Sequence, residues 1–472
     1  MTPDEFRKHA HELVEWMAGY MENIEKWPVK SSVTPGEIFN KIPDKPPQHS
    51  ESFNSLMRDF NEIIMPGITH WQNPNFFAYF PANTSPASIL AEMLIATLGA
   101  QCMIWETSPA AAELEEKMMI WLRELIGLPS GFEGVIQDTA STATLAALLT
   151  AREKATNFSG NIEGLRKSEI LKVYCSEQTH SSVEKAVKIS GIGRKNLIKI
   201  PVRDDFSLDP QKLREAILRD KKKKQVPCCV VATLGTTGTT AVDPLRAVGE
   251  ICHENDVWLH VDAAMAGTAL ILPEFQWMLD GKEYIDSFVF NPHKWMFTNF
   301  DCTAYFVKDA PALIRTFEIL PEYLKTRTRG KVNDYRDWGV PLGRRFRALK
   351  LWSVIRTYGV EGLRDKVRDH IGIAAELAAM ISKEVDFEIL APVIICVVCF
   401  RYIPAGYNED QINGFNEKLN HLLNDSGKLY LSHTVLNGIY TLRMVTAQTN
   451  VTPEHVQKAW LLIKETARSL IT

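Results

Sequence analysis

Short β-rich runs alternate with helical patterns through the middle of the chain, and this alternation constrains the fold more than any other feature of the sequence. Such an order is typical of an α/β fold in which helices cover both faces of a mostly parallel sheet. The predicted strands are Lys172–Ser176, Leu197–Val202, Cys228–Leu234, Val257–Val261, Phe288–Asn291 and Thr303–Val307. The predicted intervening helices are Ser182–Ser190, Pro210–Arg219 and Pro244–Asn255.

The chain divides into three predicted parts, since 472 residues exceed one ordinary domain. Residues 1–85 combine a helix with a proline-rich connection, and we expect this N-terminal arm to pack on a second subunit. Residues 86–360 are predicted as the large α/β domain, which ends in a long helix from Leu342 through Tyr358. Residues 361–472 are predicted as a smaller α+β domain with a hairpin turn at Asn437-Gly438.

The composition excludes several classes of protein. With 53 basic and 57 acidic side chains, the net charge of −4 leaves no basic excess for nucleic acid. No apolar run is long enough to span a bilayer, so no membrane partner is expected. The eight cysteines are scattered and predict buried free thiols rather than a metal site. The charged, helix-starting N-terminus differs from a signal peptide, which favours a cytoplasmic location.

Two strand ends carry side chains that suit chemistry, because ligands of such sheets bind beyond the carboxyl ends of the strands. Asp262 follows a buried strand and precedes two alanines, so its carboxylate could lie against a flat ligand or could equally cap the next segment. Lys294 follows the next strand; burial would make its amine nucleophilic toward a carbonyl, whereas an isolated lysine commonly reaches water.

Two further strand ends add a phosphate cradle and a ring. The stretch 138–141 leads into an alanine-rich helix whose first N–H groups could bind phosphate, although it could be a plain helix cap. His180 opens another helix and could stack on a ring or handle a proton, although a lone histidine usually does neither. Together the cradle, the ring, the carboxylate and the amine match one cofactor, pyridoxal 5'-phosphate.

The motifs resemble group II pyridoxal-phosphate decarboxylases, and most closely the aromatic-L-amino-acid decarboxylases, over essentially the whole chain. They are Asn291–Trp295, His260–Ala264, Thr179–Ser182, Pro341–Phe346 and Thr69–Pro74. The resemblance implies the fold-type-I, aspartate aminotransferase-like architecture. It also implies an obligate homodimer whose N-terminal arms wrap the partner and whose active sites lie at the interface.

The resemblance also implies roles around the cofactor. Lys294 would be the Schiff-base lysine, Asp262 would pair with the pyridine nitrogen, and His180 would stack over the ring with Ala264 beneath it. Thr237 would lie near the phenolic oxygen. The phosphate would be held by residues of three segments: Thr139, Ala140, Ser141, Asn291 and His293.

In the family, a tyrosine matching Tyr323 donates a proton to the carbanion carbon after carbon dioxide leaves. Related aldehyde synthases commonly carry Phe there, or Asn in place of the stacking histidine. This sequence keeps both Tyr323 and His180, which favours an amine product.

The implied substrate pocket has aromatic walls. Its residues are Trp71, Tyr79, Phe80, Pro81, Ala82, His180, Leu342 and Gly343, with Met103 expected from the other subunit. Gly343 leaves room, as in plant relatives selective for indolic substrates. Ala82 replaces the Thr of animal enzymes near the substrate carboxylate.

The resulting prediction is decarboxylation of tryptophan, tyrosine, phenylalanine, dopa or 5-hydroxytryptophan to the arylalkylamine. Three alternatives stay open. An aromatic aldehyde synthase is the nearest. A glutamate decarboxylase of the same superfamily would need cationic groups for a second carboxylate, and a non-catalytic scaffold would be expected to lack Lys294 or Asp262.

Overall fold

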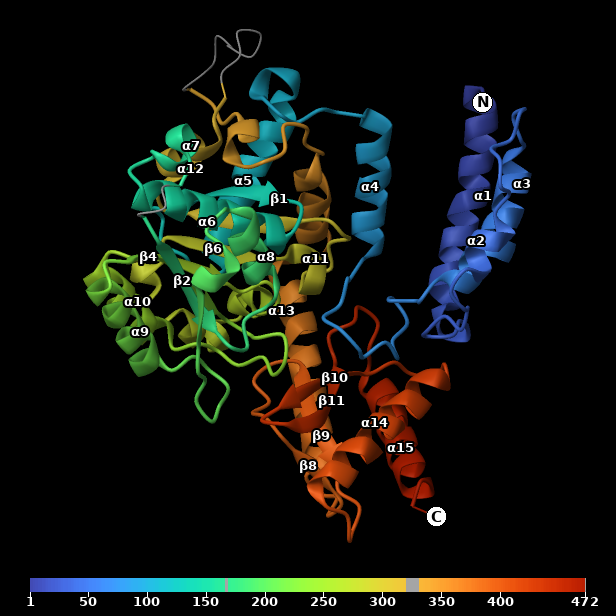
Figure 1. Cartoon of the computed structure of the whole chain (residues 1–472). Helices are drawn as coiled ribbons and strands as arrows, with labels where there is room; N and C mark the ends of the chain where they lie inside the picture. The colour runs from blue at the N-terminus through green and yellow to red at the C-terminus, as the bar shows by residue number, and fades with distance from the viewer. Residues whose placement is uncertain (166–168, 320–330, 472) are drawn as a thin grey trace. The chain divides into compact units, whose positions relative to one another are not determined.

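The computed structural model describes residues 1–165, 169–319 and 331–471, which form two compact units (Figure 1). The first unit comprises residues 1–81, 373–390 and 398–472, and the second unit comprises residues 82–372 and 391–397. No helix within the described ranges is both long and apolar enough to cross a membrane.

A seven-stranded sheet forms the centre of the second unit. Its strands are β1 Glu133–Gln137, β2 Leu171–Ser176, β3 Leu197–Ile200, β4 Val226–Thr233, β5 Trp258–Asp262, β6 Ser287–Phe290 and β7 Thr303–Val307. Their order is β1-β7-β6-β5-β4-β2-β3, and all pairings are parallel except the two that β7 makes. Six strands therefore point the same way, and their carboxyl ends share one edge with the start of β7.

Helices cover both faces of this sheet, as predicted for an α/β fold. The helices around the sheet are α5 Pro109–Leu125, α6 Ala140–Ala155, α7 Gly160–Glu163, α8 Ser182–Ile189, α9 Pro210–Lys222, α10 Leu245–Asn255, α11 Pro292–Trp295 and α12 Ala310–Phe317, whereas α4 Pro86–Leu98 stands clear of the sheet (Figure 1). Helices α6 and α8 pack in one core with Val173 and Cys175 of β2. Tyr174 points to the opposite face, where its hydroxyl donates to Asp220 of α9 at 3.0 Å.

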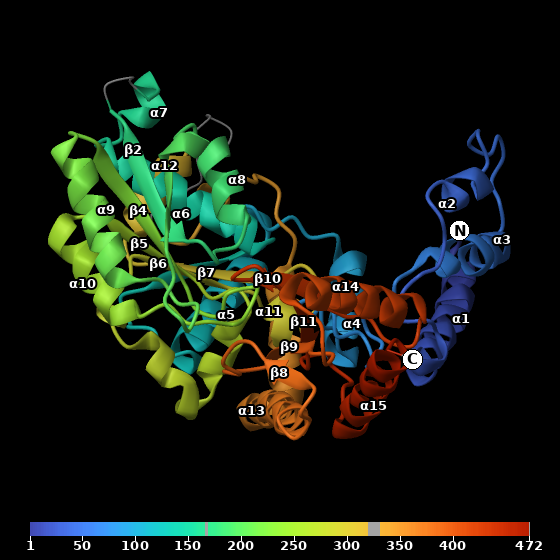
Figure 2. The same ribbon diagram turned by 60° about the horizontal axis from the view of Figure 1, so that its bottom comes forward.

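The first unit contains two groups of elements. Near the N-terminus lie α1 Pro3–Glu22, α2 Glu37–Lys41 and α3 Phe53–Asp59. The C-terminal part holds β8 Phe387–Ile389, β9 Val397–Tyr402, β10 Ser432–Leu436, β11 Ile439–Val445, α14 Glu409–Asp425 and α15 Pro453–Ser469. The four strands form a sheet against which α14 packs (Figure 2). Asn437 and Gly438 form the predicted turn between β10 and β11, both with positive φ.

The prediction of a helix from Leu342 is wrong in its start. Helix α13 spans Arg347–Ile381 and is interrupted at Gly359, whose φ is 67°. Residues 341–346 are not helical, because the backbone of Arg344 pairs elsewhere: its N–H donates to the Gln101 side chain and its carbonyl accepts the N–H of Cys102.

Candidate active site

The carboxyl ends of β5 and β6 bring Asp262 and Lys294 onto neighbouring segments. Beyond the last residues of the two strands, the Ala263 N–H donates to the Val289 carbonyl at 2.9 Å. The Asn291 N–H donates to the Ala264 carbonyl at 3.0 Å. Lys294 then lies in α11, where its N–H donates to the Asn291 carbonyl at 2.9 Å. The two strand ends are thus held together up to the residues that the sequence singled out.

Asp262 is almost fully buried and lies on the face of the sheet that α6 covers. His260, two residues earlier on the same face, is 3.3 Å from Thr144 of α6. Ala264 donates its N–H to the Asp262 carboxylate at 3.0 Å, which fixes the carboxylate orientation. The adjoining turn is tight, since a Cβ on Gly235 would stand 2.6 Å from the Cβ of Ala266. Thr237 follows in that turn, at the end of β4.

His180 is held as a neutral ring. Its Nδ1 accepts the N–H of Ser182 at 3.2 Å and lies 2.8 Å from the Ser182 hydroxyl, so the ring proton belongs on Nε2. Burial lowers the pKa of His180, the charge of Lys294 lowers it further, and Asp262 opposes both. These influences place His180 in the electrostatic surroundings of the other two side chains.

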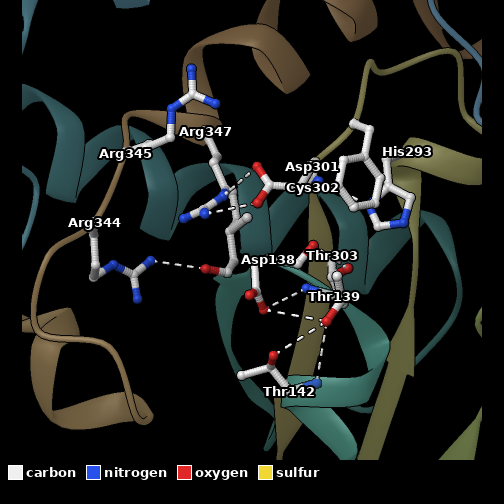
Figure 3. Close-up of polar contacts among 12 residues, drawn as sticks. Asp138, Thr139, Thr142, His293, Asp301, Cys302, Thr303, Arg344, Arg345 and Arg347 are labelled. Atoms are coloured by element: carbon white, nitrogen blue, oxygen red, sulfur yellow. Dashed lines mark hydrogen bonds and ion pairs between the residues drawn. The ribbon is translucent and has the colours of Figure 1, made fainter. Parts of the chain in front are cut away.

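The predicted phosphate cradle is the N-terminus of α6. Thr139 is its cap, with the Thr142 N–H directed to the Thr139 hydroxyl at 3.4 Å and the Thr139 N–H donating to Asp138 at 2.6 Å (Figure 3). Ala140 and Ser141 occupy the first turn, where N–H groups have no partner within the helix. A helix start of this kind attracts anions.

His293 and Asn291 border the same cradle. The N–H of Cys302 donates to His293 Nδ1 at 2.9 Å, which leaves Nε2–H as a donor. Burial, followed by the charge of Lys294, lowers the pKa of His293 to about 3. The Thr303 hydroxyl lies 2.9 Å from the Asn291 side-chain oxygen and 3.1 Å from the Asp138 carbonyl, and so links the ends of β1, β6 and β7.

Sequence reasoning missed the residues that support this edge. Arg347 makes a two-pronged ion pair with Asp301, with both N–O distances at 3.0 Å, and both side chains are largely buried (Figure 3). Asp301 directly precedes Cys302, the donor to His293. In the sequence, Arg347 stands out only as part of the cluster of three arginines between Arg344 and Arg347. That cluster does not predict which acidic residue Arg347 pairs with.

The predicted substrate residues fall in both units. Within the first unit, Trp71 stacks on Phe76 at 4.5 Å and on Tyr79 at 5.8 Å, while Phe80 lies under the Arg443 guanidinium at 5.1 Å. Pro81 ends the first segment of this unit, and Ala82 begins the second unit.

In the second unit, the backbone carbonyl of Met103 accepts the backbone N–H of Arg336 at 3.0 Å. Leu342 and Gly343 are exposed. Tyr323 lies outside the described residues.

A comparison with known families settles the affiliation of this site. Residues 35–403 match the model of the pyridoxal-dependent decarboxylase conserved domain. The chain belongs to the pyridoxal-dependent decarboxylase family. It is a carboxy-lyase whose cofactor is pyridoxal 5'-phosphate.

Relatives of this decarboxylase cover its full length. Phenylacetaldehyde synthase of Arabidopsis thaliana is 42% identical over 481 residues, which are 100% of this chain and 97% of that protein. Tyrosine decarboxylase 4 of Petroselinum crispum is 42% identical over 485 residues, or 100% and 95% of the two chains. The crystal structure of Oryza sativa TDC with PLP and tryptamine matches with a TM-score of 0.97 at 37% identity, covering 100% of this chain and 99% of that one.

The carboxyl edge of the sheet in this decarboxylase fits the cofactor group by group. The start of α6 and the neutral Nε2–H of His293 suit an anionic phosphate. The Asp262 carboxylate suits a protonated ring nitrogen. Ala264 and His180 suit the two faces of a flat ring, and Lys294 supplies the amine that pairs with an aldehyde.

Proposed function

We propose that this decarboxylase converts an aromatic L-amino acid to the corresponding arylalkylamine and carbon dioxide. The observation that carries the proposal is the meeting of Lys294, Asp262 and His180 at one edge of the sheet, next to a helix start suited to phosphate. The aromatic side chain is supported by the names of the relatives and by the exposed aromatic pair Trp71 and Tyr79.

Each residue has one task in this proposal. When bound, pyridoxal 5'-phosphate supplies an electron sink for the pair left behind by carbon dioxide. Asp262 would keep the ring nitrogen protonated, and His180 would pack on the ring as a neutral imidazole. Lys294 would hold the aldehyde through its amine and would give up that place to the amine of the substrate. Tyr323 donates the proton that replaces the lost carboxylate on Cα.

The phosphate site is built from neutral hydrogen-bond donors. Because the pKa of His293 lies at about 3, its ring stays neutral and donates through Nε2 rather than adding a charge. Ala140 and Ser141 contribute backbone N–H groups without bulky side chains, and Thr139, Asn291 and Thr237 complete the polar surroundings.

The direct test incubates the purified holoenzyme with tryptophan, tyrosine, phenylalanine, dopa and 5-hydroxytryptophan. Amines are separated by chromatography and carbon dioxide is trapped. We expect one amine per carbon dioxide with at least one of the five. Absence of both products with all five would overturn the proposal, whereas release of 4-aminobutyrate from glutamate would point to the glutamate branch.

The aldehyde synthase reaction is the second candidate, because a phenylacetaldehyde synthase is 42% identical to this chain. The two reactions differ in co-substrate and by-products, since the synthase consumes dioxygen and water and releases ammonia and hydrogen peroxide. We expect the wild-type chain to form amine and the Tyr323→Phe variant to shift toward aldehyde, ammonia and peroxide. Peroxide from the wild type would favour the synthase, and unchanged amine output from the variant would show that another group supplies the proton.

We further propose that the chain works as a homodimer in which Met103 and the N-terminal arm serve the partner. Helix α4 supports this, because it exposes Leu90, Leu94 and Leu98 at 61%, 57% and 62%. Such an apolar stripe is unusual on a monomer. Sedimentation should give about twice the chain mass, and Leu94→Glu should shift the molecule to monomer; a monomeric wild type would contradict the proposal.

A cytoplasmic location is proposed on the state of the cysteines. All eight are free and buried, which suits a reducing compartment. Fractionation of cells that express the tagged chain should place it with cytoplasmic markers, and recovery in the secreted fraction would contradict this.

A further inference from the structure

Trp295 directly follows Lys294 and ends the one-turn helix α11. Its side chain is fully buried, and its indole N–H donates to Nδ1 of His370 at 2.9 Å. His370 lies 75 residues further along the chain, in α13. A helix of four residues has too few backbone hydrogen bonds to fix its own orientation, so α11 depends on such side-chain contacts.

His370 accepts this hydrogen bond as a neutral ring. The side chain is buried, and burial followed by the charge of Lys366 lowers the pKa of His370 to about 3. Because an indole nitrogen only donates, Nδ1 of His370 is the acceptor and the ring proton belongs on Nε2. The two rings lie nearly parallel, with an interplanar angle of 11° and centroids 6.4 Å apart. The contact therefore fixes both the position and the plane of the Trp295 indole.

Lys294 lies between two anchored side chains. On its N-terminal side, His293 Nδ1 accepts the Cys302 N–H at 2.9 Å. On its C-terminal side, Trp295 donates to His370 at the same distance. Both hydrogen bonds reach outside α11 and together set the rotation of its single turn. Because a displacement of about 1 Å at a reacting group can cost about 10²-fold in rate, this rotation decides whether the Lys294 amine is correctly placed.

The chain that leaves α11 is held by the same part of α13. Phe297 has a φ of 54°, which is rare for an aromatic residue. Its ring centroid lies 5.9 Å from that of His370 and 6.1 Å from that of Tyr358, and the Lys366 amine stands 5.6 Å over the ring. The Ser85 hydroxyl donates to the Phe297 carbonyl at 2.8 Å. His370 thus contacts both rings that follow Lys294.

We propose that His370 is a positioning residue: by accepting the Trp295 indole N–H, it fixes the turn from which Lys294 reaches the cofactor. The inference rests on the role of Lys294 in the proposed function. Loss of the acceptor would leave a buried donor unpaired, and the cost of that state favours a rotation of α11 toward another partner. Such a rotation would carry the Lys294 side chain with it.

The test compares two substitutions of His370 in the purified holoenzyme. His370→Leu removes the acceptor, whereas His370→Asn keeps one, because the amide oxygen is bonded to Cγ as Nδ1 is. We expect His370→Leu to lower kcat about tenfold to hundredfold and His370→Asn to recover most of that loss. Equal losses in the two variants would show that the hydrogen bond is not what matters, and would overturn the proposal.

A spectroscopic measurement reports the geometry of the cofactor without turnover. Pyridoxal 5'-phosphate has no stereocentre, so the circular dichroism of its visible band arises from the way in which the protein holds it. We expect the ratio of visible ellipticity to absorbance to fall in His370→Leu and to return in His370→Asn. An unchanged ratio in the folded leucine variant would overturn the positioning role.

The matched control is Tyr174→Phe, which breaks the buried hydrogen bond to Asp220 on the opposite face of the sheet. This variant should lose stability in urea unfolding and keep both the ellipticity ratio and kcat. If its ratio falls as far as that of His370→Leu, the effect of His370 is a general loss of stability and the proposal fails.

Trp295→Phe removes the donor from the other side of the contact and gives the same readouts if His370→Leu does not fold. In the Trp295→Phe background, His370→Leu should cause no further fall in the ellipticity ratio, because the hydrogen bond is already gone. Additive losses would show that His370 acts independently of Trp295 and would overturn the proposal.

The inference and the proposed function fail separately. An active wild type in which His370→Leu changes neither kcat nor the ellipticity ratio would overturn only the role of His370. A wild type that releases no amine and no carbon dioxide, but whose ellipticity ratio falls in His370→Leu and returns in His370→Asn, would overturn only the proposed reaction.

Discussion

The two ends of the seven-stranded sheet carry similar residues but differ in what surrounds them. At the carboxyl edge lie Asp262 and Lys294. At the amino edge, Asp286 precedes β6 and Lys308 follows β7, and the Lys308 N–H donates to the Asp286 carbonyl at 2.9 Å. A polar cavity of about 420 Å³ opens at this second edge, lined among others by His253, Trp258 and Tyr284.

The difference between the edges is the polarity of the helix ends. The carboxyl edge receives the start of α6, whereas the amino-edge cavity is bordered by Ala155 and His253 from the last turns of α6 and α10. A helix start attracts anions and a helix end repels them. A buried carboxylate beside a lysine is therefore not enough for a phosphate cofactor, and the polarity of the adjoining helix decides which edge can bind it.

The largest expected effect comes from the two lysines. Lys294→Ala should remove the visible absorbance of the cofactor-bound protein and lower decarboxylation on the order of 10⁴-fold, because the amine that binds the aldehyde is lost. Lys308→Ala is the matched control and should keep both colour and activity, since its amine donates to the Glu283 carbonyl at the amino edge, at 3.1 Å. A Lys294→Ala protein that is still coloured and active would show that the lysine at the carboxyl edge does not bind the cofactor.

The two aspartates give the next effect. Asp262→Asn should lower kcat about 10²-fold, because an amide cannot hold the charge that a protonated ring nitrogen requires. Asp286→Asn should leave kcat within about twofold, since the Asp286 carboxylate accepts the Leu259 N–H at 2.7 Å, away from the carboxyl edge. Steady-state kinetics on both variants measure this; equal losses would mean that Asp262 acts through stability.

Buried groups of the sheet also respond to pH in opposite directions. Burial lowers the pKa of His293 to about 3 and of His260 to about 4, so their contribution to stability is present above about 6.5 and is lost as the pH falls. Burial raises the pKa of Asp286 to about 6, so its contribution is present below about 4 and is lost as the pH rises.

Urea unfolding between pH 4.5 and 7 measures how the free energy of unfolding depends on pH, and therefore the net contribution of these three groups. The free energy of unfolding should fall on acidification, and Asp286→Asn should steepen that fall by up to about 1.4 kcal/mol per pH unit. A shallower slope in the variant would contradict the assignment.

The smallest effect concerns two helix caps. Thr139 caps α6 at the carboxyl edge, and Asp309 caps α12 at the amino edge through the Ala312 N–H at 3.0 Å. Alanine at either position should lower the free energy of unfolding by about 1 kcal/mol. Only Thr139→Ala should also weaken cofactor binding, measured as the concentration that restores activity to the apoenzyme; equal cofactor affinity in both variants would argue against the cradle.

The α/β fold was predictable because periodicity is local. The strand Thr303–Val307 was predicted with its observed bounds, and the other five predicted strands differ by one or two residues at their ends, whereas β1 was not among the predicted strands. The helix predicted from Leu342 failed because its first turn competes with long-range partners. Gln101 and Cys102 take the backbone groups of Arg344, and no local pattern reports such a contact.

The sequence by itself determined the family, the cofactor and the residue types that follow each strand, since motifs and periodicity are written along the chain. Only the tertiary structure decided how those residues are oriented. Cys302 selects the ring tautomer of His293, Arg347 holds Asp301, and Arg344 orients Gln101. Each of these contacts joins residues that only folding brings together, because hydrogen bonds depend on distance and angle in space rather than on position in the sequence.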